Sequence, residues 1–230
     1  MTKKLVVANW KMNIFLREAV TLLKSINIED LHKSLVICPS FIYIPTLVDA
    51  FKKLDFGAQD CSANDLGAYT GEIAASMLYE IGCKYVIIGH SERRISCGED
   101  NQTVGRKLIK ALESKITPII CVGEPLKVRN QDSTLEYLFK QLEEIGVSRN
   151  KKFVIAYEPI WAIGSGFTPS VDEIKAIFNK IKGAYPYLQL LYGGSVGPEN
   201  ADEFFGIDVL DGLLVGGASL SAQKLNQILS

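Results

Sequence analysis

The sequence predicts an α/β protein with one (β/α)8 barrel domain over residues 1–230, in which eight parallel strands are each followed by a helix. Three observations favour this fold. Short apolar runs recur at intervals of roughly 20–36 residues, and stretches with helical periodicity lie between them. The chain has 230 residues, which is close to the about 250 that such a barrel takes.

Eight apolar runs predict the strands. A parallel sheet that is covered on both faces has strands that are apolar on both faces, and these runs have that composition. They lie at residues 5–9, 35–38, 56–59, 85–89, 118–122, 153–157, 189–192 and 212–215. The structural alternative is a doubly wound open sheet, which usually has fewer strands and a GxGxxG turn after the first one.

Four stretches between these runs have apolar residues spaced for one face of a helix. Asp132 and Asp172 precede the last two stretches, and we expect them to be cap or first-turn acids, which the helix dipole stabilises. The four apolar sets are Leu16, Val20, Leu23 and Ile26; Val104, Leu108, Ala111 and Leu112; Leu135, Leu138, Phe139, Leu142 and Ile145; and Ile174, Ile177, Phe178 and Ile181.

The composition limits the classes of function. With 47% hydrophobic and 22% charged residues, the chain fits a folded globular protein. A net charge of −1 gives no support for nucleic-acid binding, and no apolar run approaches the roughly 18 residues of a membrane span. Five cysteines without a CxxC pair favour neither a disulfide framework nor a metal site. We expect a cytoplasmic protein without metal, with Cys38 and Cys121 buried.

In this fold the functional side chains lie where strands end and loops begin. One cation, one imidazole, one carboxylate and two glycine-rich turns are expected to converge on one rim of the barrel. The residues concerned are Asn9 and Lys11 after the first strand, His90, Ser91 and Glu92 after the fourth, Glu158 after the sixth, Gly193, Gly194 and Ser195 after the seventh, and Gly216 and Gly217 after the eighth.

Glu158 directly follows an apolar strand and precedes a hinged, glycine-containing segment. A carboxylate that is held rigidly and then covered from water suits a catalytic base. A lone glutamate at a strand end is more often a cap or a salt-bridge partner, but the segment behind it favours catalysis. The expected lid consists of Pro159, Ile160, Trp161, Ala162, Ile163, Gly164, Ser165, Gly166, Phe167 and Thr168.

His90 ends an apolar run and precedes Ser91-Glu92, a pair typical of a helix start. Backbone N–H groups that point at an imidazole disfavour its protonation. We therefore expect a neutral His90 that donates a hydrogen bond to a carbonyl, whereas His32, in a polar connector, is expected to be structural. Lys11 would supply the positive charge that a developing enediolate and a phosphate both favour. The alternative is a solvated surface lysine, which its position directly after Asn9-Trp10 does not favour.

The glycine pairs after the seventh and eighth strands leave backbone N–H groups accessible, which is the recurrent phosphate site of this fold. The alternative is that these glycines only close tight turns, but two pairs at adjacent strand ends favour phosphate. A base, a neutral donor, a cation and a phosphate site, without a cofactor cradle, suit proton transfer next to a carbonyl.

Five segments, in order along nearly the whole chain, resemble the triosephosphate isomerase family. They are Asn9-Trp10-Lys11, Gly89-His90-Ser91-Glu92-Arg93-Arg94, the run from Ala156 to Gly164, Tyr192-Gly193-Gly194-Ser195-Val196 and Gly216-Gly217-Ala218-Ser219. The resemblance implies reversible conversion of dihydroxyacetone phosphate and D-glyceraldehyde 3-phosphate, without a cofactor. A glutamate base, a neutral histidine and a closing loop are the established arrangement of that family.

The resemblance also implies a role for each residue of the expected site. Glu158 would shuttle the proton and His90 would polarise the substrate oxygens, with Ser91 and Glu92 in support. Lys11 and Asn9 would hold the anion. Main-chain groups at Gly164, Ser195, Gly216 and Gly217 would bind the phosphate.

The same resemblance implies a homodimer, in which the loop from Gln59 to Glu72 reaches the partner through Thr70 at its tip. An ordinary surface loop is the alternative. Ser165 and Phe167 depart from the usual threonine and the common lysine of the family. Pro169 stands where the family often has a residue whose N–H meets the strand-seven tyrosine in the closed lid. Since proline has no N–H, we expect that Tyr192 does not hold the lid through residue 169.

Two other functions compete with this one. A phosphosugar lyase or aldolase on the same barrel would need a Schiff-base lysine inside it, and the predicted strands offer only Lys11 at the rim. A phosphate-binding barrel without chemistry would be expected to lack Lys11, His90 or Glu158, and all three are present.

Overall fold

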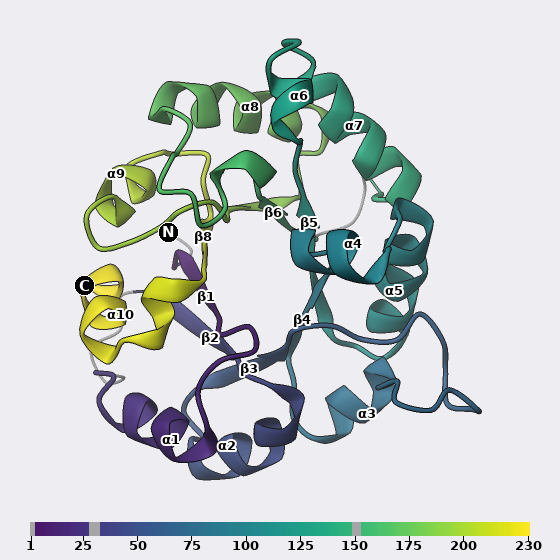
Figure 1. Cartoon of the computed structure of the whole chain (residues 1–230), viewed down its shortest axis with the longest axis vertical. Coiled ribbons are helices and arrows are strands. Elements are labelled where there is room, and N and C mark those ends of the chain that lie inside the picture. Colours follow the sequence, from purple (N-terminus) through teal and green to yellow (C-terminus); the bar gives the residue numbers. More distant parts are fainter. Residues whose placement is uncertain (1–2, 28–32, 149–152) are drawn as a thin grey trace.

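The computed structural model describes residues 3–27, 33–148 and 153–230, so His32 lies outside the described residues. Eight strands form a closed barrel, in which each strand pairs in parallel with the next and β8 pairs with β1 (Figure 1). The closed barrel confirms the predicted fold and excludes the open sheet. The strands are β1 (Leu5–Asn9), β2 (Ser34–Cys38), β3 (Asp55–Ala58), β4 (Tyr85–Ile88), β5 (Thr117–Val122), β6 (Val154–Tyr157), β7 (Gln189–Tyr192) and β8 (Gly212–Val215).

Each strand boundary lies within one residue of its prediction. The closure between β8 and β1 depends on a glycine, because Gly212 pairs with Leu5 across the seam. A Cβ atom at Gly212 would lie 1.8 Å from the carbonyl oxygen of Leu5. Only a residue without a side chain therefore fits at this point of the barrel.

Helices surround the barrel on its outer side (Figure 1). They are α1 (Leu16–Lys24), α2 (Ile44–Ala50), α3 (Ala75–Glu80), α4 (Ser91–Cys97), α5 (Asn101–Glu113), α6 (Leu126–Arg129), α7 (Thr134–Ile145), α8 (Val171–Ala184), α9 (Ala201–Phe205) and α10 (Ala222–Leu229). Short 3-10 turns occur at Phe41–Tyr43, Ile160–Ala162 and Gly217–Leu220. In the part of the chain that is described, no helix has the length and apolar character needed to cross a bilayer.

The predicted apolar faces pack against the barrel, with one exception. Leu112 on α5 is 37% exposed, so its predicted burial is wrong. At about 100° per residue, Leu112 lies about 80° around the helix from Val104, at the edge of the buried face. The other predicted members are buried or packed against the core.

The two predicted first-turn acids differ in outcome. Asp172 lies in the first turn of α8, which Ser170 and Glu173 start with a capping box, and this confirms the prediction. The prediction for Asp132 is wrong, because Asp132 lies in a turn before α7 with a φ of +54°. Its backbone turns out of the helical path two residues before α7 begins.

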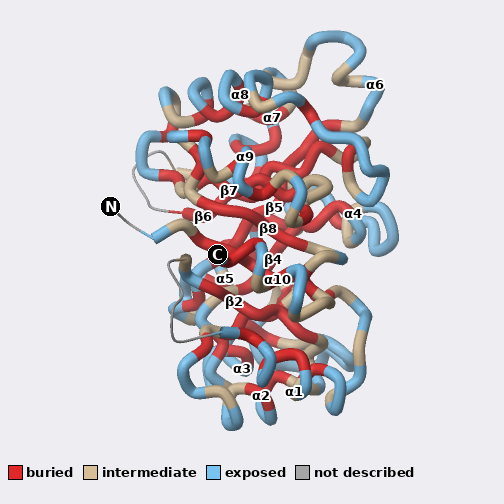
Figure 2. The backbone as a smooth tube through the Cα atoms, turned by 90° about the vertical axis from the view of Figure 1, so that its left-hand side faces the viewer, coloured by how far each residue is buried: buried red, intermediate tan, exposed pale blue. Residues whose placement is uncertain are grey.

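The buried residues form two layers, one inside the barrel and one between the strands and the helices. Along the backbone, buried residues follow the strands at the centre, and exposed residues lie at the periphery (Figure 2). Alternation along β1 shows the division: Val7 points into the barrel, whereas Val6 and Ala8 pack against the helices. Cys38 and Cys121 lie in the inner layer as expected. Burial raises the pKa of the Cys38 thiol far above its usual range, so it stays a small apolar group.

Candidate active site

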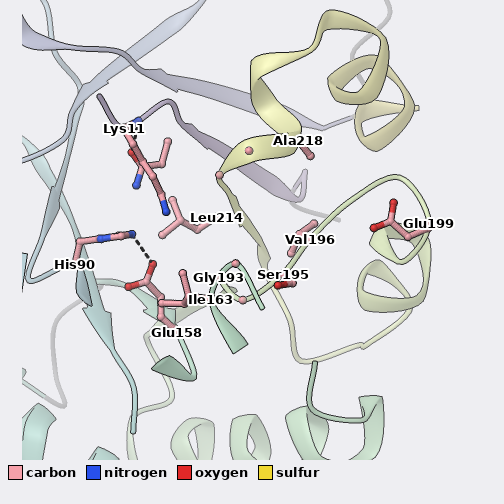
Figure 3. Close-up of a pocket in the computed structure, with 15 residues that line it drawn as sticks. Lys11, His90, Glu158, Ile163, Gly193, Ser195, Val196, Glu199, Leu214 and Ala218 are labelled. Atoms are coloured by element: carbon pink, nitrogen blue, oxygen red, sulfur yellow. Dashed lines mark hydrogen bonds and ion pairs between the residues drawn. The ribbon is translucent and has the colours of Figure 1, made fainter. Parts of the chain in front are cut away.

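The carboxyl ends of the strands surround a cavity of about 220 Å³ (Figure 3). It brings together eight residues that the sequence predicted: Asn9, Lys11, His90, Glu158, Gly164, Ser195, Gly216 and Gly217. Ile163 from the expected lid also lines it, with the strand-end glycines Gly193 and Gly194. Val196, Glu199, Leu214 and Ala218 complete the lining and were not among the predicted site residues.

Glu158 is held at the end of β6, where only 2% of it is exposed. Its backbone N–H donates to the carbonyl of Val122, which extends the pairing with β5 by one residue. Two glycines give it room: a Cβ atom at Gly123 would lie 1.7 Å from the Glu158 carbonyl oxygen, and one at Gly193 would lie 2.9 Å from its Cγ. The carboxylate is therefore fixed by backbone packing and shielded from water.

The Glu158 carboxylate contacts two groups of the β4–α4 junction. Its Oε1 lies 3.1 Å from Nε2 of His90, as Figure 3 shows. Its Oε2 lies 3.5 Å from the backbone nitrogen of Ser91. A nearby Ser91 fits the supporting role that the sequence suggested, and the imidazole contact is one that no local sequence signal revealed.

His90 is the N-cap residue of α4, and the backbone N–H of Glu92 donates to its Nδ1 at 3.2 Å. A nitrogen that accepts a hydrogen bond carries no proton, so in this arrangement the ring proton of a neutral His90 lies on Nε2, toward Glu158. Burial lowers the pKa of His90, but the charge and hydrogen bond of Glu158 raise it, and the net pKa lies above its ordinary value. Glu158 is therefore the main group that opposes the effect of burial on the pKa of this ring.

Lys11 reaches the cavity from a strained turn after β1, with a φ of +52°. Two hydrogen bonds hold the turn: the Lys11 N–H donates to Oδ1 of Asn9 at 3.2 Å, and Nε2 of Gln59 donates to the Lys11 carbonyl at 2.8 Å. The ammonium pairs with the Glu92 carboxylate at 2.8 Å. Glu92 thus contacts both Lys11 and His90.

Glycine-rich turns form the opposite end of the cavity. Gly217 begins the 3-10 turn after β8, and a Cβ atom at Gly217 would have no described atom within 4 Å. The Ser195 hydroxyl donates to the carbonyl of Ala162 at 2.6 Å, which ties the turn after β7 to the first half of the lid. Gly217 is exposed, and Gly194, Ser195 and Gly216 are half-buried, so this end of the cavity is open to solvent.

The two halves of the predicted lid differ. In the first half, Nε1 of Trp161 donates to Glu124 at 2.9 Å, and the Arg129 guanidinium lies 4.2 Å from the centre of the Trp161 ring. In the second half, residues 164–168 are exposed, and Gly164 and Gly166 have positive φ angles. Phe167 is 71% exposed. Residues 164–168 of the lid are thus exposed to solvent, whereas Trp161 in the first half is packed against Glu124 and Arg129.

Tyr192, at the end of β7, has a buried hydroxyl that has no hydrogen-bond partner among the described residues. Burial and the charge of Glu124 raise its pKa, so it is a neutral phenol. Pro169 is also buried. The hydroxyl and the proline are consistent with the expectation that residue 169 gives Tyr192 no hydrogen bond.

A buried lysine does occur, but outside the barrel. Lys107 on α5 is bound to Asp60 and Glu99, and Arg93 contacts the same two carboxylates at 2.5–2.8 Å. These four residues form an ionic cluster that no local pattern predicted. The eight described strands of the barrel contain no lysine, so they offer no amine for a Schiff base inside the barrel.

Parallel barrels that gather a carboxylate, an imidazole and an ammonium at this mouth are enzymes, and the chain falls in that class. A family model described as triosephosphate isomerase matches residues 4–230. The triosephosphate isomerase of Hahella chejuensis is 40% identical, with 100% of this chain and 98% of the relative covered. That of Bordetella pertussis is 42% identical, with 98% and 96% covered. The chain belongs to the triosephosphate isomerase family.

Proposed function

We propose that the chain interconverts D-glyceraldehyde 3-phosphate and dihydroxyacetone phosphate through an enediol(ate). The observation that carries this proposal is the contact between the buried Glu158 and His90 in a cavity that has glycine turns at its other end. Family membership, shared with relatives named triosephosphate isomerase, supports the same substrates.

In the proposed reaction Glu158 takes a proton from the carbon next to the substrate carbonyl. The electron pair moves onto the carbonyl oxygen and gives an enediolate. His90 would relay a proton from the hydroxyl of the neighbouring carbon to this oxygen. Glu158 would then return its proton to the former carbonyl carbon, as the neighbouring carbon becomes the new carbonyl. Substrate would enter between Glu158 and His90, so that the Nε2–H of neutral His90 donates to the carbonyl oxygen. The fixed backbone of Glu158 supports this role, because a base must be aimed before the substrate binds.

Lys11 and Asn9 would stabilise the negative charge that develops on the substrate oxygens. Lys11 lines the same cavity as Glu158, and its ammonium forms an ion pair with Glu92 that fixes its position. Charge that is fixed before reaction stabilises an anion without reorganisation. The phosphate would bind main-chain N–H groups at Gly164, Ser195, Gly216 and Gly217, with the lid from Pro159 to Thr168 closing over it.

We also propose that residues 1–230 form one domain and that the protein acts in the cytoplasm. We propose further that it is a homodimer, in which the loop from Gln59 to Glu72 contacts the partner. This loop projects away from the barrel (Figure 1). It exposes Leu66, Tyr69 and Thr70, two of which are large apolar side chains. Its first residue, Gln59, donates a hydrogen bond to the Lys11 carbonyl, so contacts of the loop with a partner would affect the position of Lys11. Light scattering should give a mass of twice 25.4 kDa; a single-chain mass at micromolar concentration would contradict the homodimer.

A coupled assay with glyceraldehyde 3-phosphate tests the function, and Glu158→Asp tests the base. Withdrawing the carboxylate by one methylene should lower kcat about 100-fold or more, because the base loses its aim. KM should change by less than about threefold, since the carboxylate does not bind the phosphate. Glu203→Asp, on the exposed side of α9, is the matched control. An equal kcat in Glu158→Asp and the wild type would exclude Glu158 as the base.

A further inference from the structure

Glu199 is a second carboxylate on the cavity, separate from Glu158. It lies in the turn between β7 and α9, at the far end of the cavity from His90 and Glu158 (Figure 3). Ser195 and Gly217, which line the same end, belong to the proposed phosphate site. A carboxylate at a site for an anion is electrostatically unfavourable, so its presence needs an explanation.

The turn that carries Glu199 is held by side-chain hydrogen bonds. Oδ1 of Asn200 accepts from the Gly197 N–H at 2.9 Å, and its Nδ2 donates to the Ser195 carbonyl at 3.1 Å. The Glu199 carboxylate lies across Gly197, where a Cβ atom would be 2.3 and 2.4 Å from its two oxygens. Gly197 leaves the space that the carboxylate occupies beside the cavity.

The charge of Glu199 has no counterion among the described residues that line the cavity. Lys11 is the one lysine or arginine in that lining, and its ammonium pairs with Glu92. A phosphate bound to the glycine turns would therefore feel the Glu199 carboxylate as well as the Lys11 ammonium. That ammonium lies 3.8 Å from the position of a Cβ atom at Gly216 and is already paired with Glu92. For a dianion the repulsion is twice that for a monoanion at the same distance.

We propose that Glu199 is a specificity-determining residue, which limits the affinity of the site for dianionic ligands and so sets how readily they leave. The inference rests on the proposed function, because it needs a phosphate at the glycine turns. The phosphate charge does not change while the carbon skeleton reacts. The repulsion therefore acts equally on substrate, transition state and product, and it appears in binding rather than in the chemical step.

Sulfate is the probe, because it is a dianion across the working pH range and cannot react. In Glu199→Gln, which keeps the size of the side chain, the inhibition constant of sulfate and the KM of glyceraldehyde 3-phosphate should each fall about fivefold. Glu199→Lys should lower both more than tenfold. The ratio of kcat/KM for glyceraldehyde 3-phosphate to that for unphosphorylated glyceraldehyde should rise about fivefold in Glu199→Gln, and the change should shrink at 0.5 M salt.

Glu203→Gln is the matched control, since it removes one negative charge from the exposed surface of the neighbouring helix α9. It should leave both constants unchanged. Equal sulfate inhibition in Glu199→Gln, Glu203→Gln and the wild type would overturn the inference, as would a fivefold fall that persists at high salt. A wild-type protein without isomerase activity would instead refute the proposed function, so the two failures are distinguishable.

Discussion

Two groups of charged residues with buried carboxylates lie near α4. They differ in how the negative charge of their carboxylates is balanced. In the ionic cluster, Asp60 and Glu99 are each shared between Arg93 and Lys107, so two carboxylates meet two cations. In the cavity, the buried Glu158 faces one imidazole, one backbone N–H and the Cys121 thiol. Balanced charge holds the cluster together, although one Glu99 oxygen has no hydrogen-bond partner among the described residues. A carboxylate that pairs with no lysine or arginine keeps lone pairs for a reaction.

Lys107→Met should show the largest effect on stability. The change leaves Asp60 and Glu99 buried with Arg93 alone, and breaking a buried ion pair costs about 3–5 kcal/mol. The measurement is the free energy of unfolding in urea. Lys140→Met is the control, because Lys140 is an exposed partner of Glu144 at 3.9 Å and should lose less than about 1 kcal/mol. A Lys107→Met protein as stable as this control would show that the cluster is not compensated as described.

The pKa of His90 tests how strongly the Glu158 carboxylate acts on its neighbour in the cavity. Burial lowers this pKa and Glu158 raises it to a net value above 6.5. In Glu158→Gln the charge is lost, and burial should then leave the pKa below 6.5. Titration of the imidazole by NMR measures both. An unchanged pKa in Glu158→Gln would show that the carboxylate does not control the ring.

The same shift gives a pH dependence of the reaction. Since the raised pKa means that His90 is protonated at higher pH than an ordinary histidine, kcat/KM should rise as the pH passes up through that value. The neutral ring, which the reaction needs as a donor, is then the main form. A kcat/KM that falls over this interval would contradict a neutral His90.

Tyr192→Phe should show the smallest effect. The hydroxyl is buried without a partner among the described residues, so its removal should change the free energy of unfolding by less than about 1 kcal/mol. Turnover should stay within about twofold, because Pro169 offers no N–H for a bond to Tyr192. Pro169→Ala restores that N–H and is the companion variant. A large loss of turnover in Tyr192→Phe with none in Pro169→Ala would show that Tyr192 holds the lid through another group.

The sequence predicts the part of the cavity around Glu158 and His90 better than the part around Glu199. Glu158, His90 and Lys11 each follow an apolar strand, and in a closed parallel barrel all strand ends meet at one mouth. Leu214 could have been found by the same logic, since alternation along β8 turns it inward. Glu199 follows a glycine turn, and its direction depends on the hydrogen bonds of Asn200, which no periodicity reveals.

The ionic cluster was not predictable for a related reason. Asp60 and Lys107 are far apart in the sequence, and only the packing of α5 against the barrel brings them together. Lys107 also lies on the apolar face of α5, where periodicity favours an apolar residue. Long-range pairing of charges is thus the part of the structure that local patterns leave open.

Deuterium exchange measures directly whether Glu158 moves a carbon-bound proton. Dihydroxyacetone phosphate is incubated in D2O with wild type and with Glu158→Gln, which keeps the side-chain volume but cannot accept the proton. Proton NMR should show deuterium on the hydroxymethyl carbon of the substrate with the wild type and none above background with Glu158→Gln. Exchange at the wild-type rate in Glu158→Gln would show that another group removes the proton.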